Sequence, residues 1–237
     1  MIYAIASYHR PACRTIRTLS ECGVSDSNIV VSLQDKDDIS EYKKNFPEIN
    51  FLFRETDCAA GNRNTLLDSI NERPLCLLDD DIVSFSTLTD DGRFIVDSKD
   101  GIAKIDLLAV RIEENNCILG GFAPTSNGII AKNRPELTID NLLQGTVLVV
   151  KDNSVRFDER WKMVEDYELS LRTIYNGFHV LRDNFSCAEK PKNATNEGGM
   201  HERYMNNELP IWLKRLQKKY PLFKANKNLT GGNIVWK

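Results

Sequence analysis

The chain has 237 residues and a formal net charge of −3, with 41% hydrophobic and 27% charged residues. This length suits one large domain, and the composition is ordinary for a globular protein. The charge balance gives no global sign of a nucleic-acid binder, and no apolar run approaches the ~20 residues of a membrane span. The first ten residues lack the features of a signal peptide. Six cysteines without a Cys-x-x-Cys pair argue against structural zinc and a disulfide scaffold, so we expect a reduced, cytoplasmic protein.

The first part of the chain alternates between short apolar runs and helical patterns, which predicts a parallel sheet with crossover helices. Strands are expected at residues 2–6, 28–33, 49–54 and 75–78. Helices are expected from Pro11, as the first helical residue, to Gly23, and over residues 39–45 and 62–71.

The pattern becomes mixed after residue 86. A hairpin over residues 87–97 is expected to turn at Asp91-Gly92. Helices are expected at residues 102–114, 164–175 and 202–220, the last interrupted at Pro210. Strands are expected at residues 118–122, 128–131, 142–151 and 178–181, and residues 226–237 are expected to be a surface or mobile tail. We therefore predict a single α/β domain with a mixed sheet flanked by helices.

The most informative motif is a buried-strand pattern that ends in three consecutive carboxylates, Asp79-Asp80-Asp81. Adjacent anions repel one another, and a divalent cation such as Mg²⁺ or Mn²⁺ with hard oxygen ligands is the simplest reason to hold them together. Such a cation usually arrives with a phosphate, and open α/β sheets bind ligands at the carboxyl ends of strands. The motif predicts a metal–diphosphate site, with a solvated acidic turn as the alternative.

A strand, an acidic turn and a mixed second half resemble the GT-A glycosyltransferases, which transfer a sugar from a nucleotide diphosphate. The resemblance covers roughly residues 1–205, and its anchor is the Asp79-Asp80-Asp81 triplet, similar to the Asp-x-Asp motif at the end of that fold's fourth strand. It implies a GT-A-like, Rossmann-related sheet in one domain. Residues 1–85 are then the nucleotide-sugar half, 86–205 the acceptor and catalytic half, and 206–237 a C-terminal helix and tail. The implied roles are ribose contact for Asp79 or Asp80 and metal coordination for Asp81, with Asp79 as a further ligand.

Glu165-Asp166 resembles the acidic pair at a helix start in many inverting GT-A enzymes, where one carboxylate is the catalytic base. A base is needed because an acceptor hydroxyl is a weak nucleophile until its proton is removed. The resemblance implies Asp166 as the base, with Glu165 second. The alternative is a pair of acids that complements the helix macrodipole.

A C-terminal segment, Gly198-Gly199-Met200-His201, resembles the region from which many GT-A enzymes take a further metal ligand. His201 is the implied ligand, and Gly198 and Gly199 allow backbone to approach a phosphate. The alternative is a surface histidine at the start of a helix.

The donor side is expected to include the first loop, because in this fold the end of the first strand contacts the nucleotide. Ser7 belongs to that loop, Tyr8 is a candidate to stack on a base, and Arg10 is a candidate to reach a phosphate. Arg63 lies in a Gly-Asn-Arg-Asn segment that resembles one facing the pyrophosphate in related enzymes. A surface helix residue is the alternative for Arg63.

The acceptor side has weaker candidates. They are Gly120, Gly121 and Phe122 in one expected strand, the Gln144-Gly145-Thr146 segment in another, and Trp161 shortly before the acidic pair. The alternatives are glycines that mark a bulge or turn and a tryptophan that belongs to the core.

Taken together, these motifs resemble the compact phage-type branch of the fold, whose members are similar to enzymes that glycosylate hydroxymethylated pyrimidines in DNA. The resemblance implies a Mn²⁺- or Mg²⁺-dependent, inverting transfer from a donor such as UDP-glucose to a 5-hydroxymethylpyrimidine in DNA, in the host cytoplasm if a phage encodes the chain. A basic patch, alternatively a solvated helix face, supports DNA contact: Lys214, Arg215, Lys218, Lys219, Lys224 and Lys227. The alternatives are a glycan- or protein-directed glycosyltransferase, a nucleotidyltransferase and a non-catalytic nucleotide-binding module. The sequence leaves the oligomeric state open.

Overall fold

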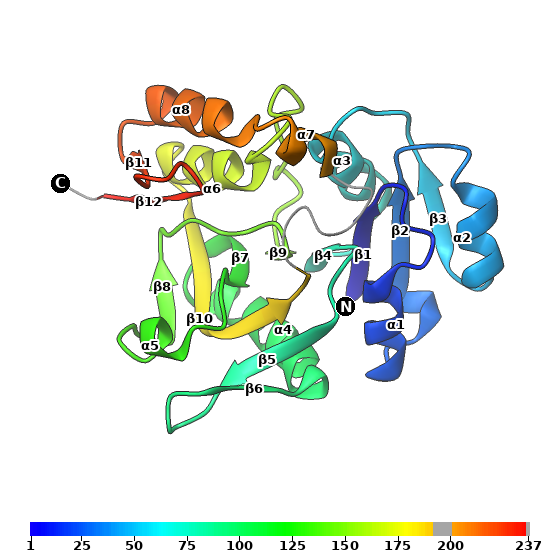
Figure 1. Cartoon of the computed structure of the whole chain (residues 1–237). Helices are drawn as coiled ribbons and strands as arrows, with labels where there is room; N and C mark the ends of the chain where they lie inside the picture. The colour runs from blue at the N-terminus through cyan, green and yellow to red at the C-terminus, as the bar shows by residue number, and fades with distance from the viewer. Residues whose placement is uncertain (192–200, 236–237) are drawn as a thin grey trace.

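Four parallel strands and three connecting helices make up the first part of the fold (Figure 1). The structure is a computed structural model that describes residues 1–191 and 201–235. The strands are β1 (Ile2–Ser7), β2 (Ile29–Leu33), β3 (Asn50–Phe53) and β4 (Leu75–Asp79). The helices are α1 (Arg14–Glu21), α2 (Ile39–Asn45) and α3 (Ala59–Ser69), with a short 3-10 turn, η1 (Asp26–Asn28), before β2.

The second part of the fold adds strands on the other side of β4. These strands are β5 (Ser84–Leu88), β6 (Phe94–Val96), β7 (Cys117–Ala123), β8 (Leu137–Ile139), β9 (Val147–Val150) and β10 (His179–Glu189). Its helices are α4 (Ser98–Glu114), α5 (Gly128–Ala131) and α6 (Glu165–Tyr175). The described residues thus form one 10-stranded sheet in the order β3-β2-β1-β4-β9-β7-β10-β5-β6, with β8 paired to β10. The predicted class, a mixed α/β single domain, is confirmed.

The strand order places a ligand site at a defined point of the sheet. The β3-β2-β1-β4 order is that of Rossmann-like nucleotide-binding folds, in which ligands bind outside the carboxyl ends of the strands where the order reverses. That reversal lies between β1 and β4. Because β9 is antiparallel to both β4 and β7, and β10 is parallel to β7, the carboxyl ends of β4, β7 and β10 lie on the same edge.

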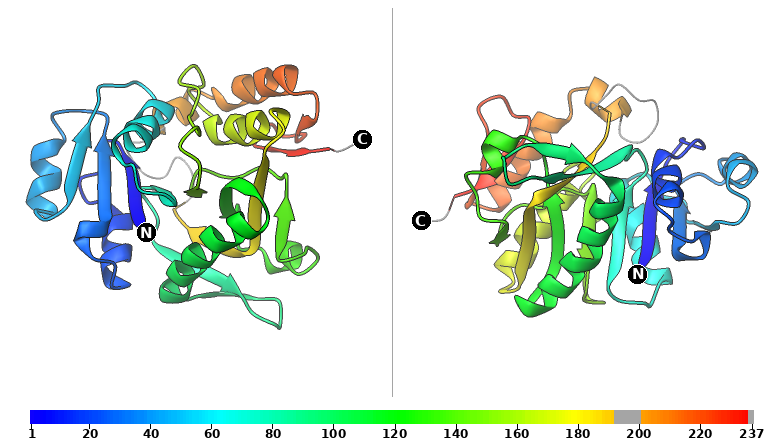
Figure 2. Two further views of the ribbon diagram at one scale, coloured as in Figure 1. Left: turned by 180° about the vertical axis from the view of Figure 1, so that it is seen from behind. Right: turned by 90° about the horizontal axis from the view of Figure 1, so that it is seen from below.

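Alternate strand residues feed two cores, one on each face of the sheet. Ile5 and Leu78 pack on the face covered by α1, α2 and α4. Ala4 and Leu77 pack on the opposite face, covered by α3 and α6. This explains the unbroken apolar run of β4, since a strand buried on both faces needs no polar alternation. Figure 2 shows the sheet from two further sides.

The C-terminal residues form a separate packed unit over α6, with helices α7 (His201–Met205) and α8 (Leu209–Lys219) and a hairpin of β11 (Phe223–Ala225) and β12 (Gly232–Ile234). The predicted interruption near Pro210 is confirmed, because Asn207 adopts a left-handed φ of 55° and Pro210 lies in the first turn of α8. Part of the predicted surface tail is β12, whose pairing with β11 the sequence pattern did not show. Within the described part of the chain, no helix is long and apolar enough to cross a membrane.

Several predicted elements differ from the structure. The expected strand over 128–131 is wrong, because these residues form α5, whose backbone Ile129 N and Ile130 N donate to the side chain of Asn127. The first helix begins at Arg14 rather than at Pro11. The expected strand over 142–151 shortens to β9, and the one over 178–181 extends through Glu189. The hairpin with its turn at Gly92 is confirmed.

Candidate active site

A pocket of about 440 Å³ opens at the carboxyl ends of β1 and β4 and reaches the start of α6. It brings together most of the residues that the sequence predicts for donor, metal and base. Among its described lining residues are Tyr8, Arg10, Arg63, Asp79, Asp80, Asp81, Glu165, Asp166 and His201. The alternative of a solvated acidic turn is wrong, because Asp80 is buried and all three residues of the triplet line this pocket.

Asp80 is held by the first loop. Ser7 Oγ donates to Asp80 Oδ2 at 2.6 Å, and Arg10 Nη1 lies 2.5 Å from Asp80 Oδ1. Tyr42 Oη accepts from the backbone nitrogen of Arg10 at 2.9 Å and lies 2.6 Å from Ser7 Oγ. Burial raises the pKa of Asp80 although Arg10 opposes the shift. Ser7 thus serves this site by orienting Asp80, and Tyr8 and Arg10 line the pocket itself.

Arg63 joins the acidic end of β4 to the start of α6. Its Nη2 lies 2.7 Å from Asp79 Oδ1 and donates to the carbonyl oxygen of Gly145 at 3.3 Å, and its Nη1 lies 2.5 Å from Glu165 Oε1. The Arg63 side chain is 6% exposed, so the surface-residue alternative is wrong. A Cβ on Gly145 would come within 2.5 Å of Arg63 Nη2, so any larger residue there would displace the guanidinium from its present position. Arg63, in α3, therefore bridges the acidic triplet and the acidic pair.

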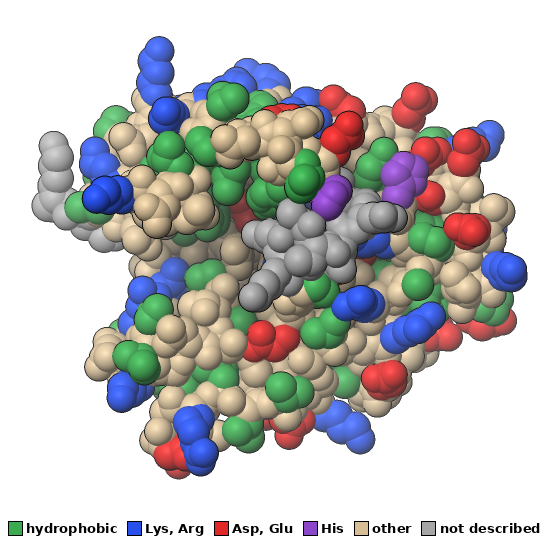
Figure 3. Space-filling model, in the orientation of Figure 1, with side chains coloured by type: hydrophobic (Ala, Val, Ile, Leu, Met, Phe, Trp, Pro, Cys, Tyr) green, Lys and Arg blue, Asp and Glu red, His purple; other side chains and the backbone are tan. Residues whose placement is uncertain are grey.

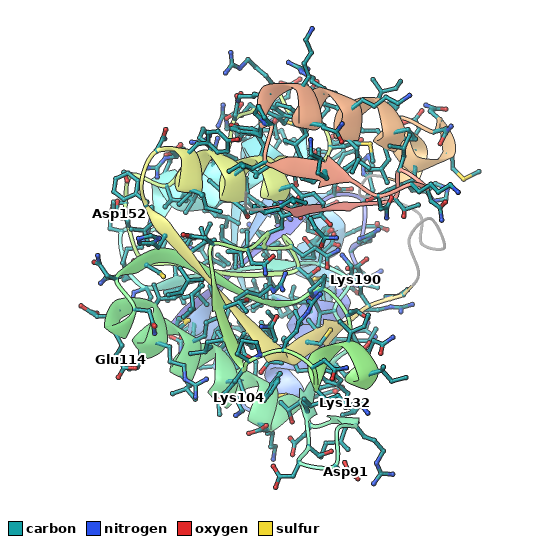
Figure 4. All side chains as sticks on the ribbon, turned by 90° about the vertical axis from the view of Figure 1, so that its left-hand side faces the viewer. Asp91, Lys104, Glu114, Lys132, Asp152 and Lys190 are labelled. Carbon is teal, nitrogen blue, oxygen red and sulfur yellow. The ribbon has the colours of Figure 1, made fainter. Side chains whose placement is uncertain are left out.

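Lys190 is a site residue that the sequence pattern missed. It follows β10 directly, and its Nζ lies 3.0 Å from Asp79 Oδ2. Figure 4 shows Lys190 toward the inside of the molecule, away from labelled outer residues such as Glu114. Burial opposes ionisation of Asp79, but Lys190 and Arg63 outweigh it and lower the pKa of this carboxyl. With both oxygens held by cations, Asp79 is poorly placed for its predicted second role as a metal ligand.

Asp166 and Glu165 begin α6 with different partners. Asp166 Oδ2 accepts from the backbone nitrogen of Gly145, and Oδ1 accepts from that of Tyr167, each at 2.7 Å. Val164 precedes the pair with a φ of 55°, a backbone conformation that β-branched residues rarely adopt. Burial raises the pKa of Asp166, and it raises the pKa of Glu165 to about 7 despite the Arg63 charge. Carboxyls with raised pKa values are suited to proton transfer.

Asp81 and His201 each keep an unpaired polar atom. Among the described residues, Asp81 Oδ1 and His201 Nδ1 are buried without a hydrogen-bond partner. A buried polar atom left unpaired costs free energy, which marks both as candidates to contact a ligand. Burial, followed by the charges of Asp79 and Asp80, raises the pKa of Asp81 to about 6.

These two residues fit a divalent ion in part. The described residues contain no cluster of three or more His, Cys, Asp or Glu side chains arranged for a metal. Mg²⁺, however, is commonly held by one or two carboxylates together with substrate phosphates. Asp81 and His201 therefore suit an ion that shares its coordination with a bound diphosphate. The predicted phosphate contacts at Gly198 and Gly199 lie outside the described residues.

Three of the predicted acceptor residues lie in the core. Gly120 and Gly121 lie inside β7, where added Cβ atoms would come within 2.6 Å of Ile112 Cδ1 and 2.7 Å of the Val147 carbonyl oxygen. Trp161 is 2% exposed and belongs to the core under α8. None of these three is among the described residues lining a pocket, whereas Phe122 lines a second pocket beside the first.

Comparison with known proteins adds a distant likeness. No protein-family model and no curated protein matches the chain. Among solved structures, CMP:2-keto-3-deoxy-manno-octonic acid synthetase in complex with CTP is similar, with 9% sequence identity and a TM-score of 0.45. The match covers 92% of this chain and 98% of that one. At this identity and TM-score the likeness says nothing about what this chain does.

Proposed function

We propose that the chain is a metal-dependent glycosyltransferase that uses a nucleotide-sugar donor. The observation that carries the proposal is the Arg63 bridge, which joins Asp79 of the acidic triplet to Glu165 of the acidic pair inside one pocket. Glycosyl transfer needs both segments in one pocket. The charge of the donor diphosphate must be neutralised near the acidic triplet, and the acceptor hydroxyl needs a base from the acidic pair. The pocket also lies at the reversal of the strand order, where nucleotides bind in this class of sheet.

The donor's diphosphate belongs beside Asp81, His201 and Arg10. Asp81 and His201 are the residues that would hold Mn²⁺ or Mg²⁺, and a bound ion would neutralise charge on the departing diphosphate. Arg10 lies 3.3 Å from Asp81 and lines the pocket, where a guanidinium suits phosphate oxygens. Tyr8, at the end of β1, lines the same wall and offers an aromatic face for a nucleobase or ribose.

Asp166 is the base in this proposal. It lines the pocket, its carboxylate is oriented by two backbone N–H groups, and its raised pKa favours proton uptake. Glu165 is less suited, because its carboxylate is engaged by the buried Arg63. Direct attack by the acceptor oxygen as Asp166 takes its proton inverts the anomeric centre.

The proposed acceptor is a 5-hydroxymethylpyrimidine in DNA, on the strength of the motif resemblance. Lys and Arg side chains gather along the upper edge over α8 (Figure 3). Two of them have internal roles, because Arg215 lies over the Trp161 ring and Lys219 Nζ lies 2.8 Å from Glu168 Oε1. Phosphate contacts would therefore depend more on Lys214 and Lys218, and DNA binding should weaken as salt rises.

Nucleotidyl transfer is the second candidate. Three cations, Arg10, Arg63 and Lys190, lie against the acidic triplet, and positive groups in this position also suit a nucleoside triphosphate. Such enzymes use clustered Asp residues with metal ions and release pyrophosphate.

The two candidates differ in their products, so one assay separates them. The protein is incubated with Mn²⁺ and a panel of nucleotide sugars, then with nucleoside triphosphates, each with hydroxymethylated DNA, unmodified DNA or a simple glycan. Mass spectrometry of the acceptor and quantification of the released nucleotide are the readouts. Nucleoside diphosphate release with a sugar-sized mass gain supports glycosyl transfer, whereas pyrophosphate release supports the second candidate. Nucleotide binding without either product would mean a non-catalytic module and would contradict both.

A further inference from the structure

A second pocket, of about 310 Å³, lies beside the first and has no role in the donor site described above. It is lined by the carboxyl ends of β7 and β10, the loop after β7 and the residues that lead into β9. Since the carboxyl ends of β4, β7 and β10 share one edge of the sheet, the two pockets are neighbours along that edge. Gln144, Thr146 and Lys190 line both.

An irregularity in β10 lies just before Lys190, one of the residues that line both pockets. Asp183 pairs with Phe122 of β7, but the next pair is Cys187 with Ala123, so β10 carries three extra residues at this point. The Asp183 carboxylate holds the extra loop by accepting from Phe185 N and Ser186 Oγ, each at 2.8 Å. Such bulges redirect a strand and often occur beside functional sites. Here the redirected end of β10 carries Lys190 to the acidic triplet.

The boundary between the pockets also reaches the proposed base. Gly145 lies between Gln144 and Thr146, and its backbone nitrogen donates to Asp166 Oδ2 at 2.7 Å. A group in the second pocket is therefore separated from Asp166 by the short 144–146 segment.

The lining of the second pocket suits a neutral ligand. The two charged residues among its described lining already have partners. Lys190 forms an ion pair with Asp79, and Glu189 accepts a hydrogen bond from Ser86 Oγ at 2.8 Å. By contrast, the side chains of Thr125, Ser126, Gln144 and Thr146 make no hydrogen bond to the described part of the protein. Hydroxyls and an amide that lack partners can both donate to and accept from a hydroxyl-bearing ligand. A charged ligand would gain little from the described lining residues, because their charged side chains, Lys190 and Glu189, already have partners.

We propose that the second pocket binds the acceptor, and that the part it holds is a neutral, hydroxyl-bearing ring. This inference rests on the proposed glycosyl transfer. The acceptor's O–H proton passes to the Asp166 carboxylate as its oxygen forms a bond to the sugar's anomeric carbon. The bond from that carbon to the diphosphate oxygen breaks, and its electron pair leaves with the nucleoside diphosphate. Donor and acceptor then occupy separate pockets that meet at residues 144–146.

The test fills the second pocket with a bulky side chain. Ser126→Trp places an indole at its mouth, while Ser40→Trp puts the same side chain on the exposed face of α2 as a matched control. Binding of two neutral probes, D-glucose and 5-hydroxymethyl-2′-deoxycytidine, is measured by saturation-transfer NMR with UDP and Mg²⁺ present. Binding of UDP itself is measured by calorimetry, and a thermal melt verifies that each variant is folded.

We expect at least one probe to bind the wild type and Ser40→Trp, and to lose at least tenfold in affinity to Ser126→Trp, with UDP binding unchanged. Equal probe binding to all three proteins, or binding of neither probe to the wild type, would overturn the acceptor pocket. Loss of UDP binding in a folded Ser126→Trp would also overturn it, since the pockets would then be one. Failure of the proposed function has a different signature, because the wild type would then release no nucleoside diphosphate from any nucleotide sugar.

Discussion

Lys190 Nζ lies 3.0 Å from Asp79 Oδ2, although 111 residues separate the two in the chain. The contact depends on the end of β10, which pairs with β5 just after the acidic triplet, and the carbonyl oxygen of Glu189 accepts from Val83 N at 2.9 Å. Together with Arg10 and Arg63, Lys190 offsets the negative charge of the acidic triplet before any ion or nucleotide binds. The charge of the site is thus arranged by contacts between distant segments.

Replacing Lys190 should separate metal binding from turnover. In Lys190→Met, Asp79 loses a competing cation, so the affinity for Mn²⁺ should rise. Turnover should fall by about 10²-fold, the scale for losing one group that stabilises a departing anion. Calorimetry and steady-state kinetics measure the two effects, and Lys190→Arg should recover part of the turnover. Loss of both properties together would point to a structural role for Lys190.

Replacing Asp166 should remove transfer while sparing the donor site. Asp166→Asn keeps one oxygen to accept a backbone N–H but cannot take a proton at neutral pH. We expect transfer to fall by about 10²–10⁴-fold, the range for general-base catalysis, with UDP and Mn²⁺ affinities within about twofold of wild type. If donor binding weakened as much as transfer, Asp166 would belong to the donor site instead.

Removing Arg63 should destabilise the fold. Arg63→Met leaves the partly buried Asp79 and the buried Glu165 without their shared cation. Breaking a buried ion pair by deleting one partner costs on the order of 3–5 kcal/mol of unfolding free energy. Urea denaturation measures this loss, and Arg93→Met, which removes an arginine from an exposed pair, should change stability by less than about 1 kcal/mol. Equal effects of the two changes would argue against the bridging role.

Metal affinity should depend on pH through Asp81. Its raised pKa of about 6 means that the carboxyl is protonated below that pH, and an ion must displace the proton to bind. Mn²⁺ affinity should therefore weaken as pH falls from 7 to 5, approaching about tenfold per pH unit below the pKa. Calorimetry at several pH values measures the slope. Asp81→Asn should bind Mn²⁺ weakly, and its affinity should lack this dependence on pH. If the affinity of that variant fell with pH as steeply as that of the wild type, the proton would belong to another group.

Most of the predicted site residues that line the first pocket share one property: they lie next to strand ends or a helix start that local patterns reveal. Asp81 follows an apolar run at the end of a predicted strand, which places it at the carboxyl edge of the sheet. Asp166 lies at the start of a predicted helix, and its place in the same site came from the resemblance of the Glu165-Asp166 pair. Lys190 was missed because its position depends on a bulge in β10, which no periodicity shows. The length of that strand was underestimated for the same reason.

The acceptor residues show the opposite error. Gly120 and Gly121 are glycines because α4 and β9 pack closely on β7, and Trp161 is large because it fills the core under α8. Unusual residue types near a site are therefore ambiguous from sequence, since tight packing and ligand contact select the same residues. Only the register of β7 against β9 separates the two explanations.

The most direct test of the central claim is nucleoside diphosphate release from a nucleotide sugar, measured for wild type and Asp81→Asn with Mn²⁺ and with a chelator. The account predicts release by the wild type that requires the divalent ion and rises with an acceptor, and a loss of at least 10²-fold in Asp81→Asn. Release that is equal with Mn²⁺ and chelator, or equal in wild type and Asp81→Asn, would contradict it.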